Sequence, residues 1–267
     1  MTSPILETHA LTRRYGSLTA VDNLTLSVAE GEIFGLLGPN GAGKTTMLKM
    51  LTTLLPPTSG DAKIAGHDIV HQAREVRRLI GYVPQMLSAD GTLSGYENLD
   101  IFGKLYDIPR VERGKRVTDA LEFMGLADSA NKLVRDYSGG MIRRLEVAQS
   151  FLHHPRVLFL DEPTTGLDPT ARRVVWEHVD RLREEFGTTI VLTTHLMEEA
   201  DRLCHRVAIM HFGKVAAIGT PAELKASLGG KEITLDDVFI HYAGDTLESG
   251  GTYRETVRTR RTAHRVG

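Results

Sequence analysis

Residues 38–45 constrain the fold of this chain more than any other stretch. They read Gly-Pro-Asn-Gly-Ala-Gly-Lys-Thr, and a second threonine, Thr46, follows them. Residues 33–37 form a short apolar run typical of a buried parallel strand, and residues 45–51 have the pattern of a helix. A glycine-rich turn between a strand and a helix directs its backbone N–H groups at one point, where the helix N-terminus adds partial positive charge. The stretch therefore predicts an anion-binding loop in an α/β fold.

The chemistry of the loop indicates which anion it binds. Its N–H groups can contact the α- and β-phosphates of a nucleotide, the amino group of Lys44 can reach the β- and γ-phosphates, and the hydroxyl of Thr45 can bind Mg²⁺. We expect these residues to contact the nucleotide: Gly38, Asn40, Gly41, Ala42, Gly43, Lys44, Thr45 and Thr46. The alternative is a glycine-rich turn with a chance lysine, and the flanking strand and helix argue against it. The loop alone does not distinguish kinases, GTPases, helicases and transport ATPases.

A second apolar run ends in two acidic residues. Residues 157–160 are apolar and are followed by Asp161 and Glu162. Ligands of open α/β sheets bind at the carboxyl ends of the parallel strands. Asp161 can hold Mg²⁺ there, directly or through water, and Glu162 can orient or deprotonate an attacking water. Alone, the two acids would be an ordinary solvated strand end, but the phosphate loop upstream favours the catalytic interpretation.

A third motif lies between these two. Ser138, Gly139 and Gly140 precede a helical stretch that covers residues 142–150. Serine is a good N-cap, and two glycines leave backbone amides open at the start of a helix. The motif predicts a second anion site without a lysine, although a Ser-Gly-Gly on its own is more often a flexible turn.

With these three motifs the chain resembles the ATP-binding cassette (ABC) family. The signature loop of that family reads Leu-Ser-Gly-Gly-Gln, and here Tyr137 and Met141 replace the outer two residues. The replacement keeps the Ser-Gly-Gly contact to phosphate and removes the glutamine side chain. Four further residues match family motifs in the same order along the chain: Tyr15, Gln85, Asp168 and His195.

The resemblance implies a role for each of these four residues. Tyr15 matches the aromatic residue that stacks on adenine, although it can also be an ordinary tyrosine of an edge strand. Gln85 matches the glutamine of the Q-loop, which approaches Mg²⁺ and faces the membrane partner. Asp168 lies in the D-loop, which contacts the opposite subunit, and His195 matches the switch histidine.

The resemblance also implies composite sites. Two ATP-binding domains of this family dimerise head to tail, and ATP lies between the phosphate loop of one and the signature loop of the other. The chain carries one copy of each loop, so a homodimer is expected. Thr45, Gln85 and Asp161 would hold Mg²⁺. Glu162 would be the general base, and His195 would hold the γ-phosphate and its water.

The implied fold is α/β. It is a P-loop NTPase of the ABC type, with a RecA-like core on a mixed or parallel sheet, an antiparallel β subdomain and an α-helical subdomain. We expect the ATP-binding domain over residues 1–230, with the helical subdomain at about 86–155 and a helix at 111–124. Residues 231–248 are expected to form an accessory or docking segment, and residues 249–267 a basic, disordered tail. Attraction of the tail to an anionic membrane surface is the alternative.

Composition limits the partners and the compartment. The chain has 267 residues and a formal net charge of −2, which argues against nucleic acid as its main ligand. Its single cysteine, Cys204, leaves no internal disulfide, which is compatible with a reducing cytoplasm. No apolar run approaches the ~20 residues of a membrane helix, and the N-terminus lacks the apolar core of a signal peptide. Transport would therefore need separate transmembrane permease subunits, with this chain bound peripherally at the cytoplasmic face of the membrane.

Two weaker features indicate the type of transporter. The altered signature loop and an amphipathic segment at residues 233–242 resemble the ATPase subunits of daunorubicin-resistance exporters. We therefore expect an ATPase that powers efflux of a small hydrophobic compound or drug, with the identity of the cargo left open. One alternative is a non-transport ABC ATPase acting on nucleic acid or ribosomes, although such proteins usually carry long coiled coils or two cassettes. The other is a nucleotide sensor that does not hydrolyse ATP, and Glu162 and His195 argue against it.

Overall fold

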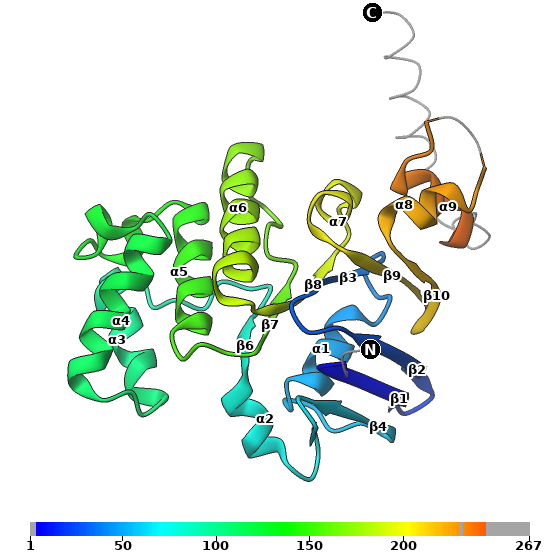
Figure 1. Cartoon of the computed structure of the whole chain (residues 1–267), viewed down its shortest axis with the longest axis horizontal. Helices are drawn as coiled ribbons and strands as arrows, with labels where there is room; N and C mark the ends of the chain where they lie inside the picture. The colour runs from blue at the N-terminus through cyan, green and yellow to red at the C-terminus, as the bar shows by residue number, and fades with distance from the viewer. Residues whose placement is uncertain (1–3, 230–231, 244–267) are drawn as a thin grey trace, which may run out of the picture.

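A six-stranded sheet forms the centre of the computed structural model, which describes residues 4–229 and 232–243 (Figure 1). Its strands lie in the order β10-β9-β3-β8-β7-β6. Their bounds are Lys214–Gly219 (β10), Arg206–His211 (β9), Ile33–Leu37 (β3), Thr189–Thr194 (β8), Val157–Asp161 (β7) and Ile80–Val83 (β6). Strands β9, β3, β8, β7 and β6 run parallel, whereas β10 pairs antiparallel with β9. The sheet is therefore mixed, as expected.

The central strands contribute to two separate cores, because successive residues of a strand face opposite sides of the sheet. Every residue of β3, β7 and β8 is buried. In β3, Ile33 and Leu37 pack in one core while Phe34 and Leu36 pack in the other. Coverage on both faces explains why these strands appear in the sequence as continuous apolar runs rather than as alternating ones.

A second sheet, which has four strands, packs against the first through helix α1 (Lys44–Leu51). Its order is β2-β1-β4-β5, with bounds Leu18–Val28 (β2), Leu6–Tyr15 (β1), Ser59–Ile64 (β4) and His67–Asp68 (β5). Its strand pairs are antiparallel. Met47 and Leu48 of α1 share a core with apolar residues of both sheets. The antiparallel β subdomain is thus found as expected.

Two groups of the remaining helices lie at opposite ends of the molecule, with the other helices between them (Figure 1). Helices α3 (Gly95–Leu105), α4 (Arg110–Phe123) and α5 (Gly139–Phe151) lie together at one end, with 3-10 turns at Ala127–Ser129 (η1) and Val134–Asp136 (η2). Helices α6 (Pro169–Phe186) and α7 (Met197–Leu203) follow β7 and β8, and α2 (Ala73–Leu79) precedes β6. Helices α8 (Pro221–Ala226) and α9 (Leu235–Ala243) lie at the opposite end.

Polar side chains explain where three of the helices begin. Ser94 and Glu97 form a capping box at the start of α3, each side chain accepting a hydrogen bond from the other's backbone N–H. Ser138 caps α5, and Asp168 caps α6 by accepting two backbone N–H groups. Such caps satisfy N–H groups that the first turn of a helix leaves unpaired.

The elements predicted around the motifs are found in the structure. The helix expected at residues 111–124 is α4, and the strand and helix that flank the glycine-rich loop are β3 and α1. The amphipathic segment at residues 233–242 covers all but the last residue of α9, whose Leu235, Val238 and Phe239 are buried. The division into domains stays a prediction, and residues 249–267, expected to be the basic tail, lie outside the described residues. Within the described part, no helix combines the length and apolar character needed to span a membrane.

Candidate functional site

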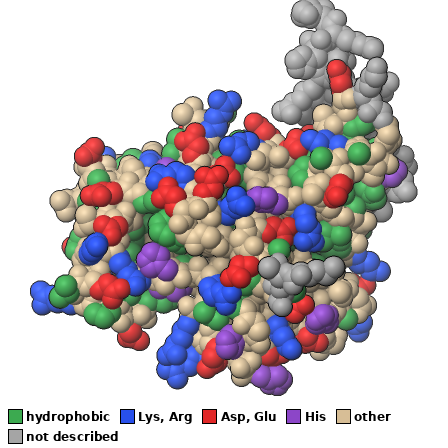
Figure 2. Space-filling model, viewed as in Figure 1, with side chains coloured by type: hydrophobic (Ala, Val, Ile, Leu, Met, Phe, Trp, Pro, Cys, Tyr) green, Lys and Arg blue, Asp and Glu red, His purple; other side chains and the backbone are tan. Residues whose placement is uncertain are grey.

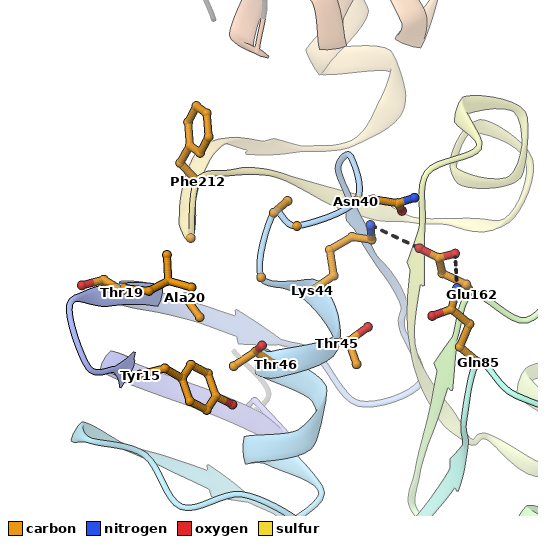
Figure 3. Close-up of a pocket in the computed structure, with 15 residues that line it drawn as sticks. Tyr15, Thr19, Ala20, Asn40, Lys44, Thr45, Thr46, Gln85, Glu162 and Phe212 are labelled. Carbon is orange, nitrogen blue, oxygen red and sulfur yellow. Dashed lines mark hydrogen bonds and ion pairs between the residues drawn. The ribbon is translucent and has the colours of Figure 1, made fainter. Parts of the chain in front are cut away.

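A cavity of about 540 Å³ opens beside the glycine-rich loop (Figure 3). Five segments from different parts of the chain surround it: the end of β1 with the start of β2, the loop with the start of α1, the segment after β6, the segment after β7, and the β9–β10 turn. The predicted residues that line it are Tyr15, Asn40, Gly41, Ala42, Gly43, Lys44, Thr45, Thr46, Gln85 and Glu162. The structure therefore brings together most of one half of the site expected from the sequence.

The backbone of the loop requires glycine at two positions. Gly43 has φ 101°, in the left-handed region, and a Cβ there would collide with the carbonyl oxygen of Ala20. A Cβ at Gly38 would collide with the carbonyl oxygen of Met210. Gly43 is also the N-cap of α1 and supplies no side-chain acceptor, so the first turn of α1 keeps N–H groups for an anion.

The amino group of Lys44 is held by oxygens around the loop. Its Nζ donates to the carbonyls of Gly38 at 2.8 Å and Pro39 at 3.1 Å, and lies 3.3 Å from Oε1 of Glu162. Burial lowers the pKa of Lys44, and the charge and hydrogen bond of Glu162 oppose this shift. A phosphate entering the cavity would compete with these oxygens for the same ammonium group.

Asp161, at the end of β7, has one carboxylate oxygen engaged and one free. Its Oδ1 accepts hydrogen bonds from Thr45 Oγ1 at 3.1 Å and from Thr193 Oγ1 at 2.6 Å. Its Oδ2 is buried and makes no hydrogen bond within the described residues. Burial, followed by the charge of Asp161 and a side-chain interaction with it, raises the pKa of Tyr82 to about 12. A buried carboxylate beside a threonine hydroxyl fits Mg²⁺, which prefers oxygen ligands.

The backbone of Glu162 is strained. Its φ of 49° lies in the left-handed region, which is uncommon for a residue other than glycine. The main-chain N–H of Glu162 is held by Thr193, with the carbonyl oxygen at 3.1 Å and Oγ1 at 3.0 Å. Strain of this kind persists where the surrounding structure enforces it, and it is concentrated at functional sites.

The side chain of Glu162 is buried at the edge of the cavity and is the centre of a cluster of polar groups (Figure 3). Its Oε2 accepts hydrogen bonds from Gln85 Nε2 and from Thr165 Oγ1, both at 3.1 Å. Nδ1 of His195 lies 3.2 Å from the same oxygen, but it is not aligned for a hydrogen bond. Two donors and the ammonium of Lys44 thus fix the orientation of the Glu162 carboxylate.

The signature residues lie away from this cavity. Ser138, Gly139 and Gly140 begin α5 and do not line the cavity, and Ser138 Oγ accepts from the N–H of Met141 at 3.3 Å. Asp168 does not line it either, because its carboxylate caps α6. The structure of one chain therefore contains the two predicted halves of the site at separate places.

Sequence reasoning missed several residues of the site. Thr193 binds both Asp161 and the backbone of Glu162, and the signal that could have indicated it is a hydroxyl two residues before His195. Phe212, in the β9–β10 turn, and Ala20, in β2, also line the cavity, and neither belongs to a motif by which the sequence could have indicated it.

Comparison with known proteins places the chain in a family. Residues 21–165 match the sequence profile of the ABC transporter family. The chain belongs to the ABC transporter family. This membership confirms the resemblance that the phosphate loop, the signature loop and the Asp-Glu strand end predicted from the sequence.

Individual relatives of this ABC protein carry export and resistance names. It is 48% identical, over 87% of its length and 72% of the relative, to daunorubicin resistance ATP-binding protein DrrA3 of Streptomyces coeruleorubidus. It is 47% identical, over 83% of its length and 69% of the relative, to Nod factor export ATP-binding protein I of Ralstonia nicotianae.

Solved structures of ABC proteins share the fold. The ATP-binding subunit of an ABC transporter has a TM-score of 0.79 and 28% identity, covering 89% of this chain and 99% of the other. An ATP-binding cassette solved as a dimer with ADP and phosphate has a TM-score of 0.71 and 28% identity, covering 80% of this chain and 98% of the other. The expected fold class is therefore confirmed.

Proposed function

We propose that the chain hydrolyses ATP with Glu162 as the general base and thereby powers export through separate membrane subunits. The observation that carries this proposal is the position of the Glu162 carboxylate. It lies at the edge of the cavity beside the phosphate loop, with Lys44 Nζ at 3.3 Å and Gln85 Nε2 at 3.1 Å. A carboxylate placed next to the γ-phosphate position can accept a proton from an attacking water.

Different residues of the cavity bind the nucleotide and carry out the chemistry. Lys44 exchanges its carbonyl partners for phosphate oxygens, with the N–H groups at the start of α1 contributing to the same anion site. Thr45, Gln85 and Asp161 would hold Mg²⁺, which would supply positive charge to neutralise the phosphates. Glu162 takes the proton of the water, and Gln85 and His195 orient the reacting groups.

Complete sites require a second copy of the chain. Ser138, Gly139 and Gly140 begin a helix outside the cavity that holds Lys44, so one chain supplies half of each site. A homodimer would bring these residues over the γ-phosphate of the partner's nucleotide. The similarity to an ATP-binding cassette solved as a dimer with ADP and phosphate supports this arrangement.

The export role rests on the relatives. Several are named for daunorubicin resistance or for Nod factor export, which supports efflux of a small hydrophobic compound or drug. The chain would act at the cytoplasmic face of the membrane, bound to permease subunits. Acidic and basic side chains are mixed over the face shown in Figure 2, and this mixture favours a protein partner over nucleic acid.

The experiment replaces Glu162 by glutamine in the full chain. Glu162→Gln keeps the shape and one acceptor oxygen and removes the base, so turnover should fall by about 10²–10⁴ while ATP still binds. Phosphate release and equilibrium binding of a labelled nucleotide measure the two effects. Glu198→Gln, an exposed glutamate on α7, is the matched control and should leave both unchanged. Turnover of Glu162→Gln within about threefold of the unaltered chain would refute Glu162 as the base.

A further inference from the structure

Helix α5 buries an ion pair that the proposed chemistry does not use. Arg143 and Glu146 are each 2% exposed, and Arg143 Nη1 lies 3.0 Å from Glu146 Oε2, without the alignment of a hydrogen bond. Removing two charges from water is costly, and their mutual attraction offsets the cost only when further hydrogen bonds satisfy both groups. Arg143 and Glu146 are called here the α5 pair. Their other contacts show what the pair does.

Arg143 binds the backbone on one side of Gln85. Its Nη1 donates to the carbonyl of Pro84 at 2.7 Å and its Nη2 donates to the carbonyl of Gln85 at 2.8 Å. The planar guanidinium presents its N–H groups in a fixed fork, so two consecutive carbonyls are held in one geometry.

Glu146 binds the backbone on the other side. Its Oε1 accepts a hydrogen bond from the N–H of Ser88 and further ones from Ser88 Oγ at 3.2 Å and the N–H of Ala89 at 3.3 Å. Between the two anchored ends, the side chains of Met86 and Leu87 are 82% and 52% exposed. The tip of this segment is therefore not fixed by burial of its own side chains, and the α5 pair holds its two ends.

The segment carries Gln85 to the reacting groups. The side chain of Gln85 donates to Glu162 Oε2 at 3.1 Å, so displacement of residues 84–89 would move Gln85 away from the proposed base (Figure 3). We propose that Arg143 and Glu146 are positioning residues that hold residues 84–89 and thereby keep Gln85 against Glu162. The proposal rests on the proposed ATPase function. It also ties Gln85 to the helix that begins with the signature residue Ser138.

Loss of the α5 pair should lower turnover without weakening nucleotide binding. Glu146→Leu leaves the N–H groups of Ser88 and Ala89 without an acceptor, and Arg143→Met leaves two carbonyls without a donor. Because misplacement by about 1 Å can cost about 10²-fold, we expect kcat to fall roughly 10- to 100-fold. KM for ATP should stay within about threefold, since Lys44 and its loop are untouched. Glu146→Gln keeps an acceptor oxygen, so its kcat should lie between those of the unaltered chain and Glu146→Leu.

Two further variants separate positioning from stability. Arg113→Met removes another partly buried arginine of the same helical group, which pairs with Asp100 at 2.6 Å, and it should keep its kcat. The double variant of Arg143→Met and Glu146→Leu removes both charges and leaves neither unpaired, so its melting temperature should exceed that of Arg143→Met. If the pair only stabilises the fold, the kcat of the double variant should recover together with its melting temperature. If the pair positions Gln85, the kcat of the double variant should stay low.

Amide hydrogen exchange tests the contacts independently of activity. In the nucleotide-free full chain, the amides of Ser88 and Ala89 should be protected, and Glu146→Leu should abolish this protection while Arg113→Met keeps it. Equal exchange of these amides in the unaltered chain and Glu146→Leu would overturn the inference. The inference would also be overturned if the unaltered chain hydrolyses ATP and both Arg143→Met and Glu146→Leu hydrolyse it with the same kcat. Absence of ATP hydrolysis by the unaltered chain would instead refute the proposed function, and the exchange result would still decide whether the α5 pair holds residues 84–89.

Discussion

At the residue scale, Glu199 links three segments that surround the site. Its carboxylate is 1% exposed, and Oε1 accepts hydrogen bonds from Trp176 Nε1 at 2.9 Å and Thr164 Oγ1 at 2.7 Å. Trp176 lies on α6, Thr164 in the loop after Glu162, and Glu199 on α7, which follows His195. A buried donor that loses its acceptor costs its full desolvation penalty. Oε1 of Glu199 therefore stabilises the packing of α6, α7 and the loop after Glu162.

Replacing the Glu199 carboxylate should destabilise the protein, and the loss should be larger when the new side chain has no hydrogen-bond acceptor. Glu199→Leu leaves two buried donors without a partner, at about 1–3 kcal/mol each, so the free energy of unfolding should fall by roughly 2–6 kcal/mol. Glu199→Gln keeps the acceptor oxygen and should lose about 1 kcal/mol or less. Urea denaturation measures both. Glu198→Leu makes the same change at an exposed neighbour and serves as the control, expected within about 1 kcal/mol of the unaltered chain. An equal loss in the leucine and glutamine variants would contradict the assigned role of Oε1.

At the scale of elements, the N-termini of α5 and α6 lie next to each other. A Cβ added to Gly140 would lie 3.0 Å from the Cβ of Ala171, and one added to Gly139 would lie 3.5 Å from the Leu167 side chain. The signature residues and the loop that contains Asp168 therefore form one surface. A partner's nucleotide would meet that surface as a unit, which explains why neither segment needs to reach the cavity of its own chain.

Blocking this surface should stop hydrolysis while leaving the phosphate loop intact. Ser138→Arg places a long side chain where the partner's γ-phosphate is proposed to lie, and ATPase activity should be lost. Ser138→Ala loses only the cap of α5, about 1 kcal/mol of stability, and should retain more activity. Mixing Ser138→Arg with Lys44→Ala protein should restore activity, because each heterodimer then holds one intact composite site. Full hydrolysis by a strictly monomeric Ser138→Arg preparation, measured beside its size in solution, would refute the shared site.

At the scale of the whole molecule, the cavity depends on how the two sheets pack. Tyr15 and Ala20 come from the antiparallel sheet, the phosphate loop leaves the six-stranded sheet, and Phe212 lies in the turn between β9 and β10. Helix α1 lies in the core between the two sheets. Packing of α1 in this core therefore holds its N-terminus at the cavity. Helix α9 packs in the core on the opposite face of the six-stranded sheet and contacts α7, α8 and strands β9 and β10.

Removing α9 should weaken the whole fold. Ending the chain after residue 231 deletes Leu235, Val238 and Phe239, which are buried. At about 1.5 kcal/mol for each side chain, the free energy of unfolding should fall by roughly 4 kcal/mol, measured by urea denaturation. Ending the chain after residue 253 is the control and keeps α9. We expect this shorter deletion to change stability by about 0.5 kcal/mol or less and to keep ATPase activity. Loss of folding in the shorter deletion would show that residues 254–267 contribute to the fold.

The features that the sequence by itself determined are those encoded within a few consecutive residues. The phosphate loop needs glycines where φ is positive, as at Gly43, and a helix after them. The buried strands need continuous apolar runs, and the caps need Ser138 and Asp168 just before a helix. These requirements are local, because main-chain geometry and periodicity act between near neighbours, and they sufficed for an α/β fold and for the residues of the phosphate loop, whereas Tyr15 and Gln85 were indicated by the resemblance to the ABC family.

Tertiary structure alone decided which of these residues meet. Glu162 lies beside Gln85, 77 residues away, because β6 pairs with β7, and Thr193 reaches Asp161 because β8 pairs with β7. The hydrogen bonds from the α5 pair to residues 84–89 likewise depend on where α5 packs. No local pattern encodes such contacts, since any of several strand orders satisfies the same hydrophobic periodicity. The order is decided by the packing of both faces of the sheet at once, which only the folded chain contains.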